Sequence, residues 1–290
     1  MIPPSFDYHA PWTLPEALEL LTRYGEEAKV LSGGQSLLPV LKLRLAQPAH
    51  VVDIGRIPDL EYVKEEPGLL RIGGRTREAT LERSELVRSR YPIVADTAAV
   101  IADPLVRNLA TVGGNLAHAD PANDHPATML AVGARVVATG PKGRREIPIE
   151  ELFTGLYSTS LAPDEIITEI DIPAPPPRTG GAYLKLERKV GDFATAAAAV
   201  QLTLAPTGEV ERAGIGLTNA GPTPVRAREA ERYLVGKALS EAAIAEAARL
   251  AAKAANPNAD RRGSVEYKRE MARVLTARAI RKAAARAGGR

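Results

Sequence analysis

The alternation of apolar and polar positions predicts a compact unit of helix and strand over the first 57 residues. A capping-box pattern, Thr13 followed by Glu16, precedes an apolar run and predicts a short helix that ends at Gly25. The next three segments are typical of a buried strand, a helix that starts or breaks near a proline, and a second buried strand. They are AKVLSGG (28–34), SLLPVLKLRLA (36–46) and HVVDIG (50–55). This order predicts a βαβ-like unit.

A second unit of mixed helix and strand is predicted for residues 58–175. Two strand-like segments flank Pro67-Gly68, which is typical of a β-hairpin. Residues 84–102 have helical character that is interrupted at Pro92. The unit closes with an alternating, half-buried strand over residues 164–173.

Residues 173–181 (PAPPPRTGG) combine stiff prolines with flexible glycines and are the best linker candidate. Beyond them, three strand-like stretches predict an antiparallel sheet, and three segments of helical period follow, the second with Ser240 as its N-cap. The stretches cover 182–190, 194–206 and 210–221, and the helical segments cover 227–236, 240–256 and 265–287. The sequence therefore predicts an α+β chain in three parts, 1–57, 58–175 and 176–290, the last a sheet covered by helices.

Composition supports a folded, globular chain. Its 290 residues are 45% hydrophobic and 25% charged, which is too apolar for a disordered protein and enough for two or three cores. No apolar run reaches the length of a membrane span, and the first residues lack the pattern of a signal peptide. We therefore expect a cytoplasmic protein.

The net charge of +3 is unevenly distributed. Residues 261–290 carry ten basic and two acidic side chains, a local charge of +8. The overall balance is not that of a nucleic-acid binder. The basic end is either the solvated face of a helix or a docking surface for an acidic partner or an anionic membrane face.

The chain has no Cys, which excludes disulfides, a cysteine nucleophile and iron–sulfur clusters ligated from this chain. Two His and two Asp fall within His118 to His125, but prolines interrupt the stretch and no HExxH spacing occurs, so we expect no metal site. A GxSxG nucleophile elbow fails because Leu38 replaces the second glycine. We find no acid/base set and nominate no catalytic residue.

Two glycine pairs, within Ser32 to Ser36 and Thr111 to Asn115, each lie between an apolar strand and polar or helical sequence. Glycine allows main-chain N–H groups to turn toward a ligand, so such loops can hold a diphosphate without Lys or Arg. Each pair alone also fits a plain tight turn, and neither matches GxGxxG or the Walker pattern. Asp124, shortly after the second pair, is the candidate acceptor for sugar or ribityl hydroxyls.

Together these segments resemble the flavin-binding medium subunit of the molybdenum hydroxylases, the family of aerobic carbon monoxide dehydrogenase and xanthine dehydrogenase-type enzymes. The resemblance covers nearly the whole chain, including residues 29–60, 110–134, 158–173 and 185–200. It implies a PCMH/VAO-like fold in which two α+β subdomains, 1–57 and 58–175, hold extended FAD. The C-terminal domain, 176–290, is then expected to cover part of the cofactor.

The resemblance also implies roles for individual residues. The diphosphate would be wrapped by Lys29, Val30, Leu31, Ser32, Gly33, Gly34, Gln35 and Ser36, together with Thr111, Gly113, Gly114 and Asn115. Asp124 would bind hydroxyls of FAD, and the flavin ring would lie near Ile101, Ile167, Lys185 and Phe193. Without a cofactor, the two isoleucines would be plain core, Lys185 a surface charge on a strand, and Phe193 a sheet-packing residue.

Two positions depart from the pattern of carbon monoxide dehydrogenases. Gln35 replaces the His of the GGHS form, and Phe193 stands where many members have Tyr. The absence of Cys separates the chain from the hydroxybenzoyl-CoA reductase branch, whose flavin subunit carries an extra cluster.

The resemblance implies partners that carry the other redox centres. These are a large molybdenum-cofactor subunit and a small [2Fe-2S] subunit, paired as a dimer of heterotrimers, with peripheral association with the inner membrane face as a further expectation. FAD on this chain would pass electrons from the clusters to an external acceptor. Two alternatives remain at this point: a free-standing FAD-dependent oxidoreductase, and a flavin-free docking or assembly protein.

Overall fold

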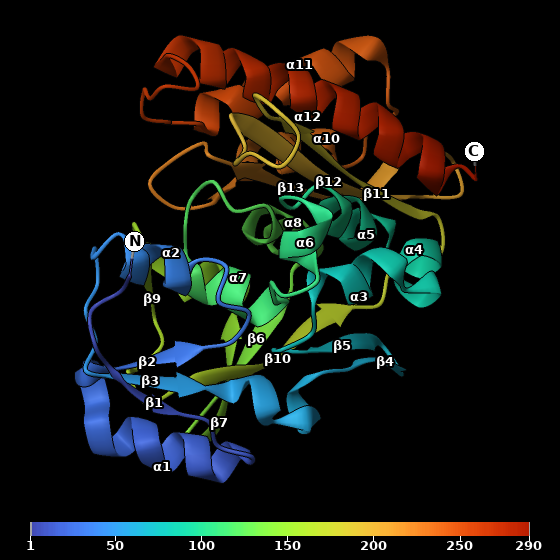
Figure 1. Ribbon diagram of the computed structural model, residues 1–290. Coiled ribbons are helices and arrows are strands. Elements are labelled where there is room, and N and C mark those ends of the chain that lie inside the picture. The colour runs from blue at the N-terminus through green and yellow to red at the C-terminus, as the bar shows by residue number, and fades with distance from the viewer. Residues whose placement is uncertain (1, 290) are drawn as a thin grey trace.

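The computed structural model describes residues 2–289 (Figure 1). Its N-terminal part is a parallel sheet with strand order β1-β3-β2, formed by β1 (Asp7–His9), β2 (Ala28–Leu31) and β3 (His50–Asp53). Helices α1 (Leu14–Tyr24) and α2 (Leu37–Lys42) connect these strands, and 3-10 turns follow at Gly25–Glu27, Ile54–Arg56 and Pro58–Leu60. The βαβ-like unit and the Thr13 capping box are confirmed, whereas β1 was not predicted.

The middle part is built on a five-stranded antiparallel sheet of order β4-β5-β10-β6-β7. Its strands are β4 (Val63–Glu66), β5 (Leu69–Gly73), β6 (Arg135–Gly140), β7 (Gly143–Pro148) and β10 (Ile166–Pro173). The hairpin at Pro67-Gly68 is confirmed. Smaller elements complete this part: α3 (Glu78–Arg83), α4 (Glu85–Arg90), α5 (Pro92–Ala99), α6 (Pro104–Arg107), α7 (Val112–His118), α8 (His125–Val132), α9 (Ile149–Leu152), β8 (Phe153–Gly155) and β9 (Ser158–Thr159).

The C-terminal part is a four-stranded antiparallel sheet covered by helices, as predicted. Its strands are β11 (Thr179–Leu186), β12 (Ala196–Leu204), β13 (Val210–Thr218) and β14 (Val225–Arg226). The helices are α10 (Arg228–Leu234), α11 (Glu241–Ala254), capped by Ser240 as expected, and α12 (Val265–Ala287). The predicted linker is too long, because β10 runs through Pro173 and β11 starts at Thr179.

Helices α5 and α8 lie between the middle and C-terminal sheets (Figure 1). Every residue of α8 is buried, and it packs directly on two glycines of β13. A Cβ at Gly216 would lie 2.9 Å from the Cα of Ala127, and one at Gly214 would lie 2.9 Å from the carbonyl carbon of Ala131. This close contact fixes the loop that precedes α8 against the C-terminal sheet. The exact division at residues 57 and 175 stays a prediction.

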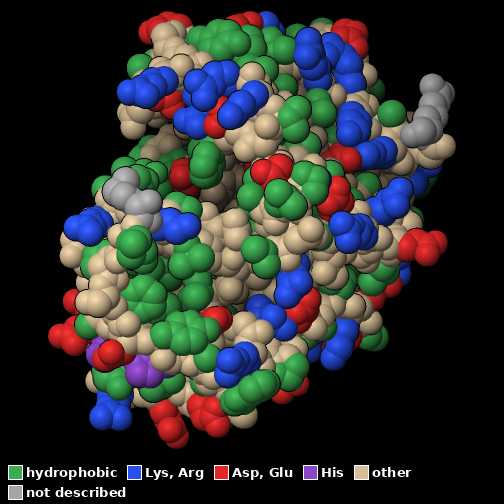
Figure 2. Space-filling model, viewed as in Figure 1, with side chains coloured by type: hydrophobic (Ala, Val, Ile, Leu, Met, Phe, Trp, Pro, Cys, Tyr) green, Lys and Arg blue, Asp and Glu red, His purple; other side chains and the backbone are tan. Residues whose placement is uncertain are grey.

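Basic side chains gather over the C-terminal helices (Figure 2), but most are paired within the chain. Six of the nine that the structure describes in residues 261–289 form ion pairs with acidic side chains: Arg262, Lys268, Arg273, Arg281, Lys282 and Arg286. The free positive charge of this region is therefore much smaller than its sequence indicates. None of the helices within residues 2–289 has the length and apolar character of a membrane span.

Candidate cofactor site

A cavity of about 950 Å³ lies where the three parts of the chain meet. This volume is at the upper end of the range for ligand pockets, roughly 300–1,000 Å³. Of the seventeen predicted site residues, only Leu31 does not line it. The residues that do are Lys29, Val30, Ser32, Gly33, Gly34, Gln35, Ser36, Ile101, Thr111, Gly113, Gly114, Asn115, Asp124, Ile167, Lys185 and Phe193.

The two glycine loops meet at one wall of this cavity. The hydroxyl oxygens of Ser32 and Thr111 are 3.0 Å apart and share a hydrogen bond. Gly33 allows this approach, because a Cβ there would lie 2.8 Å from the Cα of Ala110 and closer still to the carbonyl oxygen of Leu109. Gly33 is therefore required for the contact between the loops, in addition to any role toward a ligand.

The first loop presents main-chain donors that have no acceptor in the protein. Within residues 2–289, the N–H groups of Gly33, Gly34, Gln35 and Ser36 donate to no protein group. Polar backbone groups normally have partners when they are buried, so a run of free donors beside a cavity is suited to a bound anion. The loop can therefore supply several hydrogen bonds to a phosphate without a basic side chain.

The second loop leads directly into α7. The Thr111 side chain caps this helix by accepting from the Gly114 N–H at 3.3 Å, and the Gly113 N–H donates to the Gly74 carbonyl at 2.9 Å. The Asn115 side-chain oxygen is buried and has no partner among the described residues. The start of α7 and this amide thus add further polar groups to the same wall.

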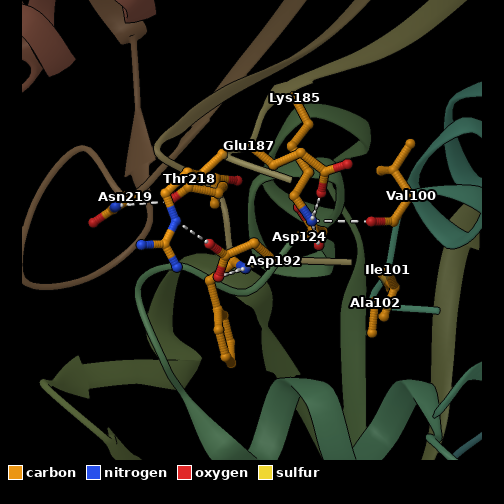
Figure 3. A network of polar contacts seen from close by, with 12 residues as sticks. Val100, Ile101, Ala102, Asp124, Lys185, Glu187, Asp192, Thr218 and Asn219 are labelled. Atoms are coloured by element: carbon orange, nitrogen blue, oxygen red, sulfur yellow. Dashed lines mark hydrogen bonds and ion pairs between the residues drawn. The ribbon is translucent and has the colours of Figure 1, made fainter. Parts of the chain in front are cut away.

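A buried polar network in the cavity wall joins the middle part of the chain to the C-terminal sheet (Figure 3). Asp124, just before α8, accepts hydrogen bonds from the Tyr183 hydroxyl at 2.5 Å and from the Lys185 Nζ at 3.0 Å. Lys185 also donates to the Val100 carbonyl at 2.9 Å and lies 3.4 Å from Glu187. Because both donors to Asp124 come from β11, the network joins the middle part of the chain to the C-terminal part.

Burial dominates the titration behaviour of this network. It raises the pKa of Asp124, although the neighbouring Lys185 ammonium and the Tyr183 hydroxyl favour the charged form. Burial, together with the Asp124 charge, also raises the pKa of Tyr183 well above its ordinary value. The Tyr183 hydroxyl therefore stays protonated and donates a hydrogen bond throughout the physiological pH range, whereas the charge on Asp124 depends on its two partners.

Apolar side chains also line the cavity. Ile101 and Ile167 are both buried and border the cavity, so core packing and ligand contact are compatible at these positions. The Lys185 side chain is only 2% exposed, which excludes a plain surface charge. Phe193 is 45% exposed and lies in the loop before β12 rather than in the sheet, beside an Arg262–Asp192 ion pair.

In the stretch from His118 to His125, the two histidines contact different carboxylates. His125 is fully buried and its Nε2 lies 2.6 Å from Glu78 of α3. The Nε2 of His118 is 3.9 Å from Asp120. Among residues 2–289, no three His, Asp or Glu side chains are grouped so as to hold a metal ion.

Sequence reasoning missed several contributors to the site, Gly74 and Tyr183 among them. The carbonyl of Gly74 accepts the hydrogen bond from the Gly113 N–H of the second glycine loop. Gly73 and Gly74 form a third glycine pair at the end of a strand, and this pair was a usable signal in the sequence. Tyr183 gave no local signal, because it meets Asp124 across 59 positions of sequence.

The sequence matches two family models. The FAD binding domain in molybdopterin dehydrogenase covers residues 4–175, and the CO dehydrogenase flavoprotein C-terminal domain covers residues 181–283. The carbon monoxide dehydrogenase medium chain of Afipia carboxidovorans is 46% identical over 99% of both chains. The 6-hydroxypseudooxynicotine dehydrogenase complex subunit alpha of Paenarthrobacter nicotinovorans is 39% identical, over 99% of this chain and 97% of that one.

Solved structures agree with these matches. Carbon monoxide dehydrogenase from Hydrogenophaga pseudoflava, in a form that lacks the Mo-pyranopterin moiety, has a TM-score of 0.96 at 48% identity over 99% of both chains. Quinoline 2-oxidoreductase from Pseudomonas putida 86 has a TM-score of 0.93 at 32% identity, again over 99% of both chains. The chain therefore belongs to the family of FAD-binding medium subunits of the molybdenum hydroxylases.

Proposed function

We propose that this chain is the electron-transfer subunit of a three-subunit molybdenum hydroxylase. It would receive electrons from iron–sulfur clusters on a small subunit, after substrate oxidation at a molybdenum centre on a large subunit, and pass them to an external acceptor. The observation that carries this proposal is the meeting of two glycine loops and a buried Asp–Lys pair at one cavity.

The residues present fit FAD as the occupant of the cavity. The free N–H groups of the first loop, and the Thr111–Asn115 loop, would hold the diphosphate. Asp124 would accept hydrogen bonds from hydroxyls of the cofactor chain, and Ile101, Ile167, Lys185 and Phe193 would surround the ring. Bound FAD supplies the capacity to accept and release electrons, which the side chains of this chain do not have.

The chain's own residues would bind, orient and tune the cofactor. The apolar side chains around Ile101 and Ile167 would keep water from the ring, and the fixed Lys185 ammonium would place a positive charge in the cavity wall. We assign no proton-transfer step to this chain. The substrate of the complex would be determined by the large subunit.

We further propose a cytoplasmic dimer of heterotrimers, by analogy with the family. Peripheral association with the inner membrane face stays a prediction, and the ion pairs on α12 leave little free charge to support it. Association with the partner subunits would then rest on other surfaces besides the basic tail.

Assembly can be tested directly. We expect the chain to elute with the large and small subunits in size-exclusion chromatography after co-expression, and the complex to contain flavin. The chain expressed alone should not oxidise organic substrates at enzymatic rates. A chain that elutes alone beside its partners, or that oxidises such a substrate unaided, would favour the free-standing flavoprotein. A complex that assembles without flavin would favour the docking protein.

A further inference from the structure

Tyr183 is a buried residue that is linked to the cavity only through Asp124. It is 2% exposed, does not itself line the cavity, and donates a hydrogen bond from its hydroxyl to Asp124. The Thr218 hydroxyl of β13 lies 3.2 Å from the same phenol oxygen. Tyr183 and Lys185 are two positions apart on β11, so both point to the same face of the sheet and meet the same carboxylate.

We propose that Tyr183 is a positioning residue for the cofactor and acts through Asp124. This inference rests on the proposed function, in which FAD occupies the cavity. Tyr183 fixes one carboxylate oxygen and Lys185 fixes the other, so the orientation of the group is set from the C-terminal sheet. Cofactor binding in the first two parts of the chain is thereby coupled to correct docking of the third.

The carboxylate retains the capacity to bind a ligand as well. Its two oxygens offer about four acceptor sites, and the described protein partners use one on each oxygen. Asp124 lines the cavity, so its remaining acceptor sites are available to hydroxyls there. Loss of the phenol would leave the group free to turn, and a misaligned carboxylate would be a poorer acceptor.

The phenol also helps to keep Asp124 charged. The titratable and charged groups around it are Tyr183, Lys185 and Glu187 from the C-terminal part, and His125 from α8. Burial raises the pKa of this carboxyl, whereas Tyr183 and Lys185 lower it. Removal of the Tyr183 hydroxyl therefore raises the Asp124 pKa further, and the charged acceptor is lost at a higher pH than in the wild type.

Tyr183→Phe provides the test, with Tyr91→Phe as the matched control. Tyr91 is also buried and donates its hydroxyl to a carboxylate, Glu65 at 2.9 Å, but neither residue lines the cavity. FAD would be removed from the assembled complex and titrated back. We expect Tyr183→Phe to weaken FAD binding by about tenfold, as for loss of a hydrogen bond to a charged group, and Tyr91→Phe to leave it unchanged.

Two further measurements separate positioning from general stability. The FAD-free full-length chains of both variants should unfold at similar temperatures. FAD affinity of Tyr183→Phe should fall at a higher pH than that of the wild type as the solution is acidified. Equal affinity for wild type and Tyr183→Phe across the pH range, or an equal loss in Tyr91→Phe, overturns the inference. A wild-type complex that binds no FAD overturns the proposed function itself.

Discussion

Replacing Gly33 by alanine should reduce FAD affinity by about ten- to a hundredfold, which corresponds to an overpacking cost of about 1–3 kcal/mol. The added Cβ would collide with the backbone of Leu109 and Ala110, which cannot move aside as a side chain would. The two loops would separate and their donors would no longer converge on one diphosphate. FAD content of the purified complex, followed by titration, measures the effect.

Two other glycines make this prediction specific. At Gly155 the nearest atom to an added Cβ is 3.8 Å away, so Gly155→Ala should retain full FAD affinity. At Gly114 an added Cβ meets only the Thr111 hydroxyl oxygen closely, at 2.8 Å, and Gly114→Ala should have a milder effect than Gly33→Ala. Full FAD retention in Gly33→Ala would show that close contact of the loops is not needed for binding.

Replacing Asp124 by alanine should lower both FAD affinity and stability. Loss of a charge-assisted hydrogen bond costs about 1.5–3 kcal/mol, so FAD affinity should fall roughly ten- to a hundredfold. The variant also removes the nearer of the two carboxylates beside the buried Lys185 ammonium and leaves only Glu187, at 3.4 Å, so the free energy of unfolding should fall by up to about 3 kcal/mol. FAD titration and denaturant unfolding measure the two effects separately.

Asp59→Ala is a suitable control for this variant, because Asp59 is exposed and does not line the cavity. Both quantities should be unchanged there. If Asp124→Ala lowers stability but leaves FAD affinity intact, then Asp124 only stabilises the contact between the middle and C-terminal parts and has no role toward the cofactor.

Much of the fold could be predicted from local sequence patterns. The Thr13 capping box and the Ser240 N-cap each depend on residues within one helical turn, and both occur as predicted. The hairpin at Pro67-Gly68 likewise depends on a turn of adjacent residues. Such signals are readable because the interacting groups are neighbours in sequence.

Elements that depend on distant partners were harder to predict. Strand β1 has only three residues and pairs in parallel with β3, more than forty positions away, so it has no hairpin signal. Helix α8 is buried on all sides and therefore lacks an amphipathic pattern. Gly180 and Gly181 suggested a flexible linker, but they lie in β11, where α12 and Ile93 leave no room for a Cβ.

The site likewise combines features that local motifs predict with features that depend on distant residues. The glycine loops and Asp124 were identified from short motifs, and the structure brings them to one cavity. The burial of Asp124 and its contacts to Tyr183 and Lys185 arise only when the C-terminal sheet docks, because these partners are about sixty residues away in sequence. Side-chain roles that depend on contact between the middle and C-terminal parts leave no pattern in the neighbouring sequence.

The position of bound FAD is the most direct test of this account. A crystal structure of the assembled complex with FAD should show diphosphate oxygens within hydrogen-bonding distance of the N–H groups of Gly33 to Ser36, with the Thr111–Asn115 loop beside them. Asp124 should contact a hydroxyl of the cofactor while keeping its bonds to Tyr183 and Lys185. A diphosphate bound elsewhere, with the two glycine loops in contact only with each other, would contradict the account.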